Sequence, residues 1–237
     1  MAYINKNEAL NRLSNIASNK KVGFEYFKNT LIFEKVLDEV IAFNRKINWE
    51  SNSANLKLVT TAEEFIRICN LRSEIYGNLG YQKEFPDALP NMNFDFYDIN
   101  SAIIYNLTNN EITATCRLIF DSDKKLPIED KLDLLSIRNK FEKIAEVSRL
   151  MVKKEQKGLN LDFKYLTLGI YNIITNNNLD ASISVILKEH FKLYGKFGGF
   201  SIEKELESYG NLESTFIITS WNPYKVSSFF RKAFLQK

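Results

Sequence analysis

A carboxylate, a hydroxyl and a guanidinium lie within four residues of each other, in a stretch that otherwise has the composition of a buried strand. The stretch covers residues 145–152, and its polar side chains are Glu146, Ser148 and Arg149. Burying charges without partners is costly. Because strand side chains alternate between two faces, we expect Glu146 and Ser148 to share one face and Arg149 to lie on the other, with Val147. The charges indicate either a functional site or a structural ion-pair network.

The rest of the composition narrows the chemistry that this strand can support. The 237-residue chain holds one histidine, His190, and its two cysteines, Cys69 and Cys116, form no CxxC pair. Imidazole catalysis, a His-rich metal site and a zinc ribbon are therefore disfavoured, and base chemistry falls to a carboxylate. We expect no metal, and we expect both cysteines to be buried core thiols.

Length, charge and hydropathy indicate a globular, cytoplasmic protein. With 45% hydrophobic and 13% aromatic residues, the chain can bury a substantial core. Isolated cysteines fit a reducing compartment, and we find neither a secretory signal nor an apolar run of the ~20 residues that a membrane span requires. A net charge of +3 without a dense basic stripe gives no support for a nucleic-acid partner.

The first part of the chain is expected to be a helical extension. From Asn7 to Trp49, apolar residues recur at helical spacing among Lys and Glu. Residues 50–55 have the small polar composition of a linker. We therefore predict a helical N-terminal extension over residues 1–55 and a main domain over residues 56–237.

Hydropathy patterns in the main domain predict an α/β (α+β) order of elements. We expect strands at 56–60, 101–107, 111–120, 142–153, 182–187, 200–205 and 214–221. We expect helices at 62–76, 160–174 and 189–197, a part-helical crossover at 126–138, and a basic C-terminal helix at 224–234 that Asn222-Pro223 opens. This is the order of the GNAT acyltransferase fold, a central mixed, mostly antiparallel, twisted sheet flanked by helices.

Five dispersed motifs make the chain resemble acyl-homoserine lactone (autoinducer) synthases and long-chain N-acyl amino acid synthases over about residues 57–221. In chain order they are Leu71–Tyr76 followed by Leu79-Gly80-Tyr81, Asp95-Phe96-Tyr97-Asp98, Arg117-Leu118, Leu126-Pro127 and Glu146-Val147-Ser148-Arg149. The resemblance implies a GNAT-fold acyltransferase, in which the pantetheine of the acyl donor enters a splay beside the central strand.

The resemblance also implies roles for the polar residues. An amine that attacks a thioester must lose a proton, and the developing oxyanion needs hydrogen-bond donors. Glu146 is the candidate base, acting directly or through a water, and backbone N–H groups around Val152 are the candidate oxyanion donors. The residues expected to shape or order the acceptor site are Arg72, Asp95, Asp98, Arg117, Ser148 and Arg149. For Asp95 and Asp98, the alternative is a purely local role in capping or turns.

The segment after the central strand bears on the acyl donor. GNAT enzymes that use coenzyme A usually carry an Arg/Gln-x-x-Gly-x-Gly/Ala loop, but residues 155–160 hold one glycine, Gly158. An acyl carrier protein suits such a loop better than acyl-CoA, and both stay open as cosubstrates; no bound cofactor is expected. Lys153, Lys154 and Lys157 form either a solvated surface or a basic rim that attracts the acidic carrier protein.

The sequence indicates the type of reaction more clearly than the identity of the acceptor. The first hypothesis is acyl transfer to the α-amine of an amino acid, and the second is transfer to S-adenosylmethionine followed by lactonisation. Tyr81 replaces the usual tryptophan and Asn93 replaces an expected acidic residue, and both changes weaken the lactone hypothesis. A non-catalytic GNAT-like binding module is the alternative from another class, and the C-terminal helix is a candidate for weak contact with a membrane surface.

Overall fold

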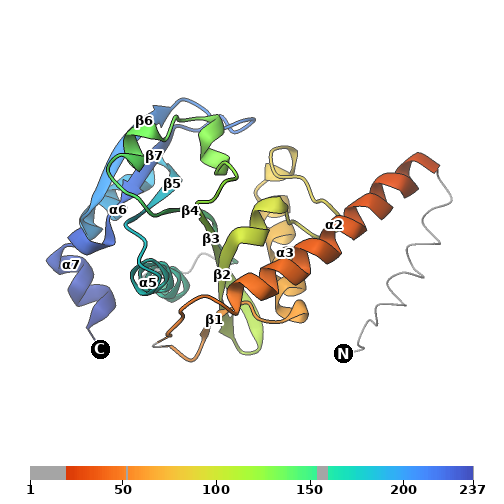
Figure 1. The fold of residues 1–237 in the computed structure, drawn as a ribbon, viewed down its shortest axis with the longest axis horizontal. Coiled ribbons are helices and arrows are strands. Elements are labelled where there is room, and N and C mark those ends of the chain that lie inside the picture. Colours follow the sequence, from red (N-terminus) through yellow and green to blue (C-terminus); the bar gives the residue numbers. More distant parts are fainter. Residues whose placement is uncertain (1–19, 52, 154–159, 237) are drawn as a thin grey trace.

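The computed structural model describes residues 20–51, 53–153 and 160–236, with side chains from residue 26 onward. One sheet with the strand order β1-β2-β3-β4-β5-β7-β6 forms its centre (Figure 1). The strands are β1 (Leu56–Leu58), β2 (Ser101–Thr108), β3 (Glu111–Phe120), β4 (Ile144–Val152), β5 (Ala181–Leu187), β6 (Phe200–Leu206) and β7 (Phe216–Trp221). Every neighbouring pair is antiparallel except β4 and β5, which confirms the mixed, mostly antiparallel sheet.

Helices cover both faces of this sheet (Figure 1). One face carries α2 (Lys20–Asn44) and α3 (Ala62–Asn78), and the other carries α5 (Leu161–Asn176) with α6 (Phe191–Phe197) and α7 (Ser228–Phe230). The crossover between β3 and β4 contains a 3₁₀ turn at Pro127–Asp130 and the short α4 (Leu135–Arg138). In the part of the chain that is described, no helix is long and apolar enough to span a membrane.

Within the predicted N-terminal extension, the structure describes the helix α2, which joins the core, and residues 1–19 lie outside the described residues. Val36 and Val40 are fully buried in the apolar cluster on the α3 face. Asn44 ends the helix against β2, where its Oδ1 accepts from the Ile103 N–H at 2.9 Å and its Nδ2 donates to the Ser101 carbonyl at 2.8 Å. The helix end therefore satisfies backbone groups of a strand. The division of the chain at residue 55 stays a prediction.

The helix α3 begins where the sequence predicts because its first turn is capped. The Thr61 hydroxyl accepts from the Glu64 N–H at 3.3 Å, and the Glu64 carboxylate accepts from the Thr61 N–H at 3.0 Å. Both cysteines are free and fully buried, Cys69 on α3 and Cys116 on β3, as expected for core thiols.

A β-bulge interrupts β4 at Arg149. Ser148 pairs with Arg117 and Met151 pairs with Thr115, so two residues of β4 oppose the single residue Cys116. Arg149 takes the left-handed conformation with φ 51°, which costs a residue with a Cβ about 1–2 kcal/mol. The extra residue changes the alternation of faces after Ser148, so the prediction that Arg149 lies opposite Glu146 was wrong.

The predicted single C-terminal helix was also wrong. Asn222 does cap a turn, but that 3₁₀ turn ends at Lys225, and Val226 and Ser227 are extended. The Ser227 N–H donates to the Phe197 carbonyl at 2.7 Å, and its hydroxyl donates to the Lys196 carbonyl at 2.6 Å. These hydrogen bonds to the end of α6 hold the backbone in an extended conformation. The helix begins again at α7 and continues as a π-helical turn at Arg231–Leu235.

Candidate active site

A chain of ion pairs lies on the α3 face of the sheet, and its most exposed member is Asp95, with 34% of the side chain exposed. Arg72 comes from α3, Asp95 and Asp98 come from the segment before β2, Arg117 comes from β3 and Arg149 comes from the bulge of β4. In order along the chain of contacts, the distances are 2.9 Å for Arg72–Asp98, 3.1 Å for Asp98–Arg117, 2.6 Å for Arg117–Asp95 and 2.6 Å for Asp95–Arg149. We call these five residues the arginine–aspartate cluster. Three guanidinium groups meet two carboxylates, so the cluster has a surplus of one positive charge.

The two aspartates also shape the backbone that carries them. The Asp95 side chain accepts from the Tyr97 N–H at 2.9 Å, and the Asp98 side chain accepts from the Asp95 N–H at 3.0 Å. This reciprocal capping opens the 3₁₀ turn Phe96–Asn100. The Asp-x-x-Asp spacing therefore serves both interpretations, since each carboxylate caps the turn and also pairs with arginines.

Both aspartates stay ionised, although Asp98 is fully buried and Asp95 is partly so. Burial raises the pKa of Asp95, but the Arg117 and Arg149 guanidinium groups outweigh it and hold that pKa well below its usual range. Burial acts in the same way on Asp98, and Arg72 and Arg117 bring its pKa below the ordinary value. Arg72 depends on this arrangement, because its Nε and Nη2 are buried without a partner among the described residues.

The bulge directs Arg149 toward neighbours that a regular strand would not offer. Its Nη1 donates to the Asn93 side-chain oxygen, and its guanidinium lies 5.9 Å from the centre of the Tyr76 ring. Asn93 is held by its own Nδ2, which donates to the Phe85 carbonyl at 3.0 Å. The resemblance implies an acidic residue at position 93. Asn93 contacts the same arginine there, but as a neutral amide.

Glu146 lies beside the cluster and is 4% exposed. It shares a face with Ser148, whose hydroxyl accepts from Arg117 Nε at 2.9 Å. The Glu146 carboxylate accepts from the Ile128 N–H in the crossover at 2.9 Å. Burial raises the pKa of Glu146 to about 7, against the lowering effect of the Ile128 N–H and of Arg117. A carboxylate with this pKa can take and release a proton near neutral pH.

Beyond Glu146, β4 loses one of its neighbours. Its pairing with β5 ends at Val147 and Ser184, whereas its pairing with β3 continues to Val152. The Lys153 N–H donates to β3, at the Thr113 carbonyl. Because consecutive residues of a strand direct their N–H groups to opposite edges, the Val152 N–H faces the edge that β5 has left. The two strands therefore separate where the resemblance implies a splay.

Of the four predicted donor-binding residues, the structure describes only Lys153. Lys153 follows β4 and pairs with Glu111 at 2.6 Å and with Glu74 at 3.3 Å. Its ammonium group is thus already engaged by two carboxylates. Lys154, Lys157 and Gly158 lie outside the described residues, so their role stays a prediction.

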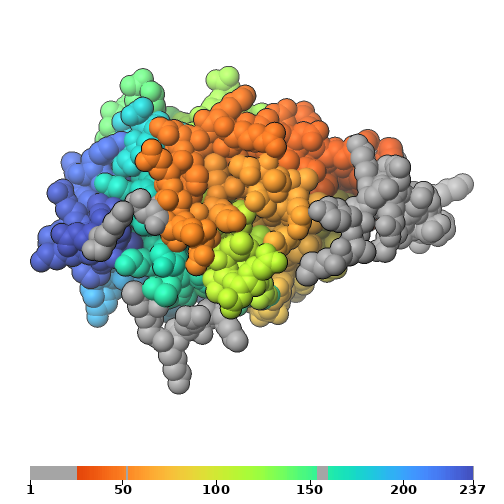
Figure 2. Space-filling view, turned by 90° about the horizontal axis from the view of Figure 1, so that it is seen from below, coloured from red at the N-terminus to blue at the C-terminus, as the bar shows by residue number. Residues whose placement is uncertain are grey.

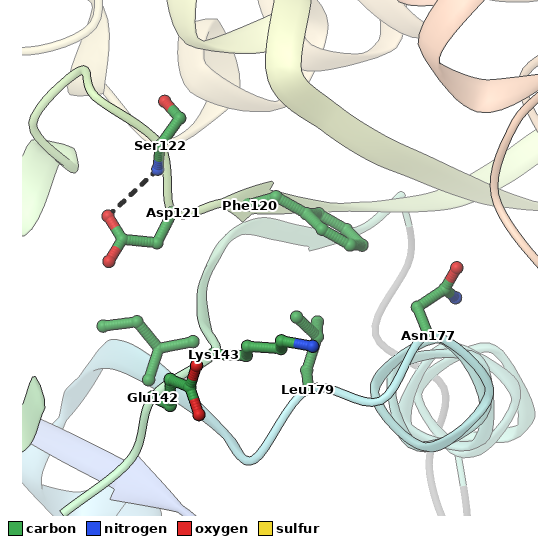
Figure 3. Close-up of a pocket in the computed structure, with 8 residues that line it drawn as sticks. Phe120, Asp121, Ser122, Glu142, Lys143, Asn177 and Leu179 are labelled. Carbon is green, nitrogen blue, oxygen red and sulfur yellow. Dashed lines mark hydrogen bonds between the residues drawn. The ribbon is translucent and has the colours of Figure 1, made fainter.

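A surface recess of about 380 Å³ lies elsewhere in the fold. Figure 3 shows its lining by the segment from Phe120 to Ser122, the segment from Glu142 to Ile144, and residues Asn177 and Leu179 after α5. These residues surround the start of β4, whereas Val152 lies at its other end. The recess shares no residue with the arginine–aspartate cluster.

Sequence reasoning missed three groups around the candidate site. The Ile128 donor is a backbone N–H, so no residue type could have revealed it. Phe85 and Tyr209 stack on each other with ring centres 6.3 Å apart, and charge on Glu146 raises the pKa of Tyr209 beyond the effect of its burial. The two rings are far apart in the chain and carry no spacing signal, since only the fold brings the β6–β7 hairpin to this place.

Comparison with known protein families matches residues 67–220 to the family described as N-acyl amino acid synthase FeeM. A search of curated proteins gave no significant match. Among solved structures, FeeM from uncultured soil microbes is 16% identical, with a TM-score of 0.54 over 76% of this chain and 93% of that one.

Two acyl-homoserine lactone synthases have similar folds. LasI is 13% identical, with a TM-score of 0.55 over 77% of this chain and 95% of that one. The CoA-dependent enzyme BjaI, solved with SAM and isopentyl-CoA, is 11% identical, with a TM-score of 0.58 over 77% of this chain and 88% of that one. At these identities the likeness concerns the fold, while the family match covers more than half of the chain. The chain therefore belongs to the FeeM family of N-acyl amino acid synthases and is an acyltransferase.

Proposed function

We propose that this enzyme transfers a fatty acyl group from a thioester donor to the α-amine of an amino acid, giving an N-acyl amino acid. The observation that carries the proposal is the position of Glu146 beside the arginine–aspartate cluster. A base with a pKa of about 7 thereby adjoins a buried surplus of positive charge, which favours an acceptor that brings both an amine and a carboxylate.

In the proposed reaction, the carboxylate of the acceptor pairs with Arg149, which Asp95 and the Tyr76 ring hold in place. Glu146 takes a proton from the acceptor's ammonium group. The neutral amine then attacks the thioester carbonyl carbon, and the oxyanion accepts a hydrogen bond from the Val152 N–H. The attack forms the C–N bond, and collapse of the tetrahedral intermediate breaks the C–S bond. A proton of the attacking nitrogen passes to the departing thiolate, so the donor leaves as a thiol and the reaction releases one proton overall. Arg72, Asp98, Arg117 and Ser148 hold the cluster in shape.

The proposed donor is an acyl carrier protein, with acyl-CoA as the alternative. The single glycine in residues 155–160 supports this choice, since it offers little of the loop that holds a pyrophosphate. We expect kcat/KM to be at least tenfold higher with the acyl carrier protein than with CoA carrying the same acyl chain. Equal values in a steady-state assay would contradict the choice. The free thiols are in keeping with a cytoplasmic enzyme.

S-adenosylmethionine is the alternative acceptor, as in lactone synthases. It carries a sulfonium cation in addition to its amino acid part. Both carboxylates of the cluster are already paired with arginines and Asn93 is neutral, so the cluster itself offers that cation no unpaired carboxylate. The electrostatics therefore favour an amino acid without a second cation.

The test is mass spectrometry of lipid extracts and of reactions of the purified protein with both donors. Glu146→Gln keeps the shape of the side chain and removes the base, so we expect kcat to fall at least ~100-fold. Glu203→Gln on β6 is the control, because Glu203 is also mostly buried and hydrogen-bonded, to Ser220 at 2.5 Å. Undiminished transfer by Glu146→Gln contradicts the base assignment. Absence of every N-acyl product from a folded parent protein favours the binding-module alternative.

The C-terminal segment supports a proposed weak contact with a membrane surface. No acidic residue occurs after Glu213, and Lys225, Arg231 and Lys232 accompany Phe229, which is 46% exposed. Figure 2 shows the C-terminal residues, in blue, forming one end of the molecule. We expect the protein to sediment with anionic vesicles and expect added salt to weaken this binding. Equal sedimentation with neutral and anionic vesicles would contradict the proposed contact.

A further inference from the structure

A row of stacked groups connects the arginine–aspartate cluster to the tip of the β6–β7 hairpin. The Tyr76 ring, under the Arg149 guanidinium, stacks on Phe85 with ring centres 4.6 Å apart and planes 19° apart. Phe85 in turn stacks on Tyr209 at 6.3 Å and 28°. Tyr209 is more than 100 residues from Phe85 in the chain. The hairpin tip is therefore a structural neighbour of the acceptor's proposed carboxylate site.

The hairpin tip is held in this place by Glu84. Tyr209 and Leu212 exchange backbone hydrogen bonds at 3.1 and 3.0 Å across a two-residue turn. The Glu84 carboxylate accepts from the backbone N–H of Asn211 at 2.8 Å and from its Nδ2 at 3.0 Å. Gly210 has φ 56°, and a Cβ there would overlap the Glu84 carboxylate. The glycine thus allows the carboxylate to cover the turn.

The Tyr209 side chain is half-buried between three segments. Phe216 of β7 lies 5.8 Å from its ring centre, and the Lys131 ammonium of the crossover lies 5.5 Å from it. The same crossover supplies the Ile128 N–H that binds Glu146. Burial raises the pKa of Tyr209 to about 12, and the charges of Glu146 and Glu84 add to the shift. The phenol is therefore within electrostatic range of the candidate base.

We propose that the Tyr209 ring contacts the side chain of the acceptor and determines which amino acids the enzyme uses. This rests on the proposed function, since it assigns the acceptor's carboxylate to Arg149 and its amine to Glu146. An acceptor held by those two groups must direct its side chain to a remaining wall, and Tyr209, half-buried at the outer end of the row of rings, supplies an aromatic ring there. The Tyr209 ring favours uncharged side chains, because Lys131 already lies 5.5 Å from its centre and a further charged group would lose its hydration there.

The test measures steady-state kinetics of the full chain with alanine, leucine, phenylalanine and lysine as acceptors. Truncation by Tyr209→Ala is expected to raise KM for the preferred acceptor at least tenfold and to change the order of preference, with KM for the donor within twofold. Tyr209→Phe keeps the ring and is expected to stay within threefold of the parent. Ile202→Ala is the control, because it removes a half-exposed apolar side chain from the same hairpin.

A second variant addresses the position of the hairpin without removing the ring. Gly210→Ala displaces the Glu84 carboxylate, and we expect it to raise acceptor KM about three- to tenfold. Circular dichroism and thermal melting show whether each variant is folded, and calorimetry with the same amino acids gives acceptor affinity independently of turnover.

The outcomes separate the two proposals. Transfer by the parent, with unchanged acceptor KM and order of preference in Tyr209→Ala, overturns the role of Tyr209 alone. A parent that binds amino acids but transfers no acyl group overturns the proposed function, and weaker binding to Tyr209→Ala then still supports the hairpin contact. A parent that binds none of the four acceptors overturns both.

Discussion

One region on each face of the sheet is buried by a different means, by charges on the α3 side and by aromatic rings on the α5 side, and we call these regions the charged face and the aromatic face. On the α3 face, the arginine–aspartate cluster and Glu146 fill the space above β3 and β4 with charges. On the α5 face, Phe197 is 1% exposed and its ring centre lies between 5.1 and 6.4 Å from other aromatic rings. Those rings belong to Phe163, Tyr194, Phe200, Phe229, Phe230 and Phe234.

The stability of each face depends on a different property of its side chains. Burial of aromatic side chains stabilises the fold in proportion to the area buried, so that face depends on volume and tolerates hydrophobic substitutions that keep the volume. Buried charges gain only when every partner is present, so the charged face depends on charge at constant volume. Isosteric substitutions should therefore separate the two faces.

The largest expected effect comes from Asp98→Asn, which keeps the shape of the side chain. Arg72 then remains fully buried beside an amide, with two of its nitrogens already without a partner among the described residues. We expect a loss of about 3–5 kcal/mol in the free energy of unfolding, measured by urea titration. The control Asp121→Asn removes one partly exposed partner of Arg138 and is expected to cost about 1 kcal/mol or less. Equal losses of free energy in the two variants would show that the buried ion pairs of the cluster stabilise the fold no more than the partly exposed pair at Asp121.

The second prediction concerns pH. Because the pKa of Glu146 is raised from 4.5 to about 7 in the folded protein, the native state binds its proton more tightly than the unfolded chain does. Its stabilising contribution is full below pH 4.5 and falls by about 3 kcal/mol as pH rises to 7. Acyl transfer should follow the reverse course and increase toward a plateau above pH 7. Urea titrations at pH 5 and pH 8 should show that the free energy of unfolding falls less for Glu146→Gln than for the parent between these pH values. An identical fall would refute the raised pKa of Glu146.

A third prediction tests the geometry of the arginine at the bulge. Arg149→Lys keeps the charge but loses the planar fork that reaches Asp95 and Asn93 together. We expect acceptor KM to rise about tenfold, with donor KM unchanged, in steady-state assays. Lys143→Arg, at the start of β4, is the matched control. A donor KM that rises as much as the acceptor KM would instead indicate general disturbance of the strand.

The smallest effect is expected at Arg138, which lies outside the charged face but holds the crossover. Its guanidinium contacts Asp121 and Glu129, and Glu129 accepts from the Leu126 N–H at 2.8 Å, just before the Ile128 donor. Arg138→Gln should loosen this turn and weaken the N–H bond to Glu146. We expect the midpoint of the pH–rate profile to move upward, with a loss of about threefold at pH 7. A lower rate with an unchanged midpoint would leave Arg138 with a structural role only.

The sequence predicted most of the fold and much of the candidate site. The alternation of apolar and polar residues located β3 and β4, and the capping residues located the start of α3. Five short motifs indicated the residues that lie in the arginine–aspartate cluster and beside it. The faces of β4 could not be predicted, because a bulge is a matter of register with β3 and Arg149 is an unusual residue for a left-handed position. The Ile128 N–H and Tyr209 depend on long-range packing, which leaves no local pattern.

The bulge adds one residue to β4 without moving the residues that follow it. Beyond Arg149, Met151 packs into the core beside α3, while Leu150 and Val152 pack into the core beside α5. Deleting Arg149 would restore regular pairing with β3, with Leu150 opposite Cys116 and Met151 still opposite Thr115, so these side chains would keep their faces and the Val152 N–H its edge. The bulge therefore supplies an arginine to the arginine–aspartate cluster without changing the packing of the rest of the strand. In a set of related sequences, a deletion at this position should remove the arginine and leave the apolar end of β4 intact.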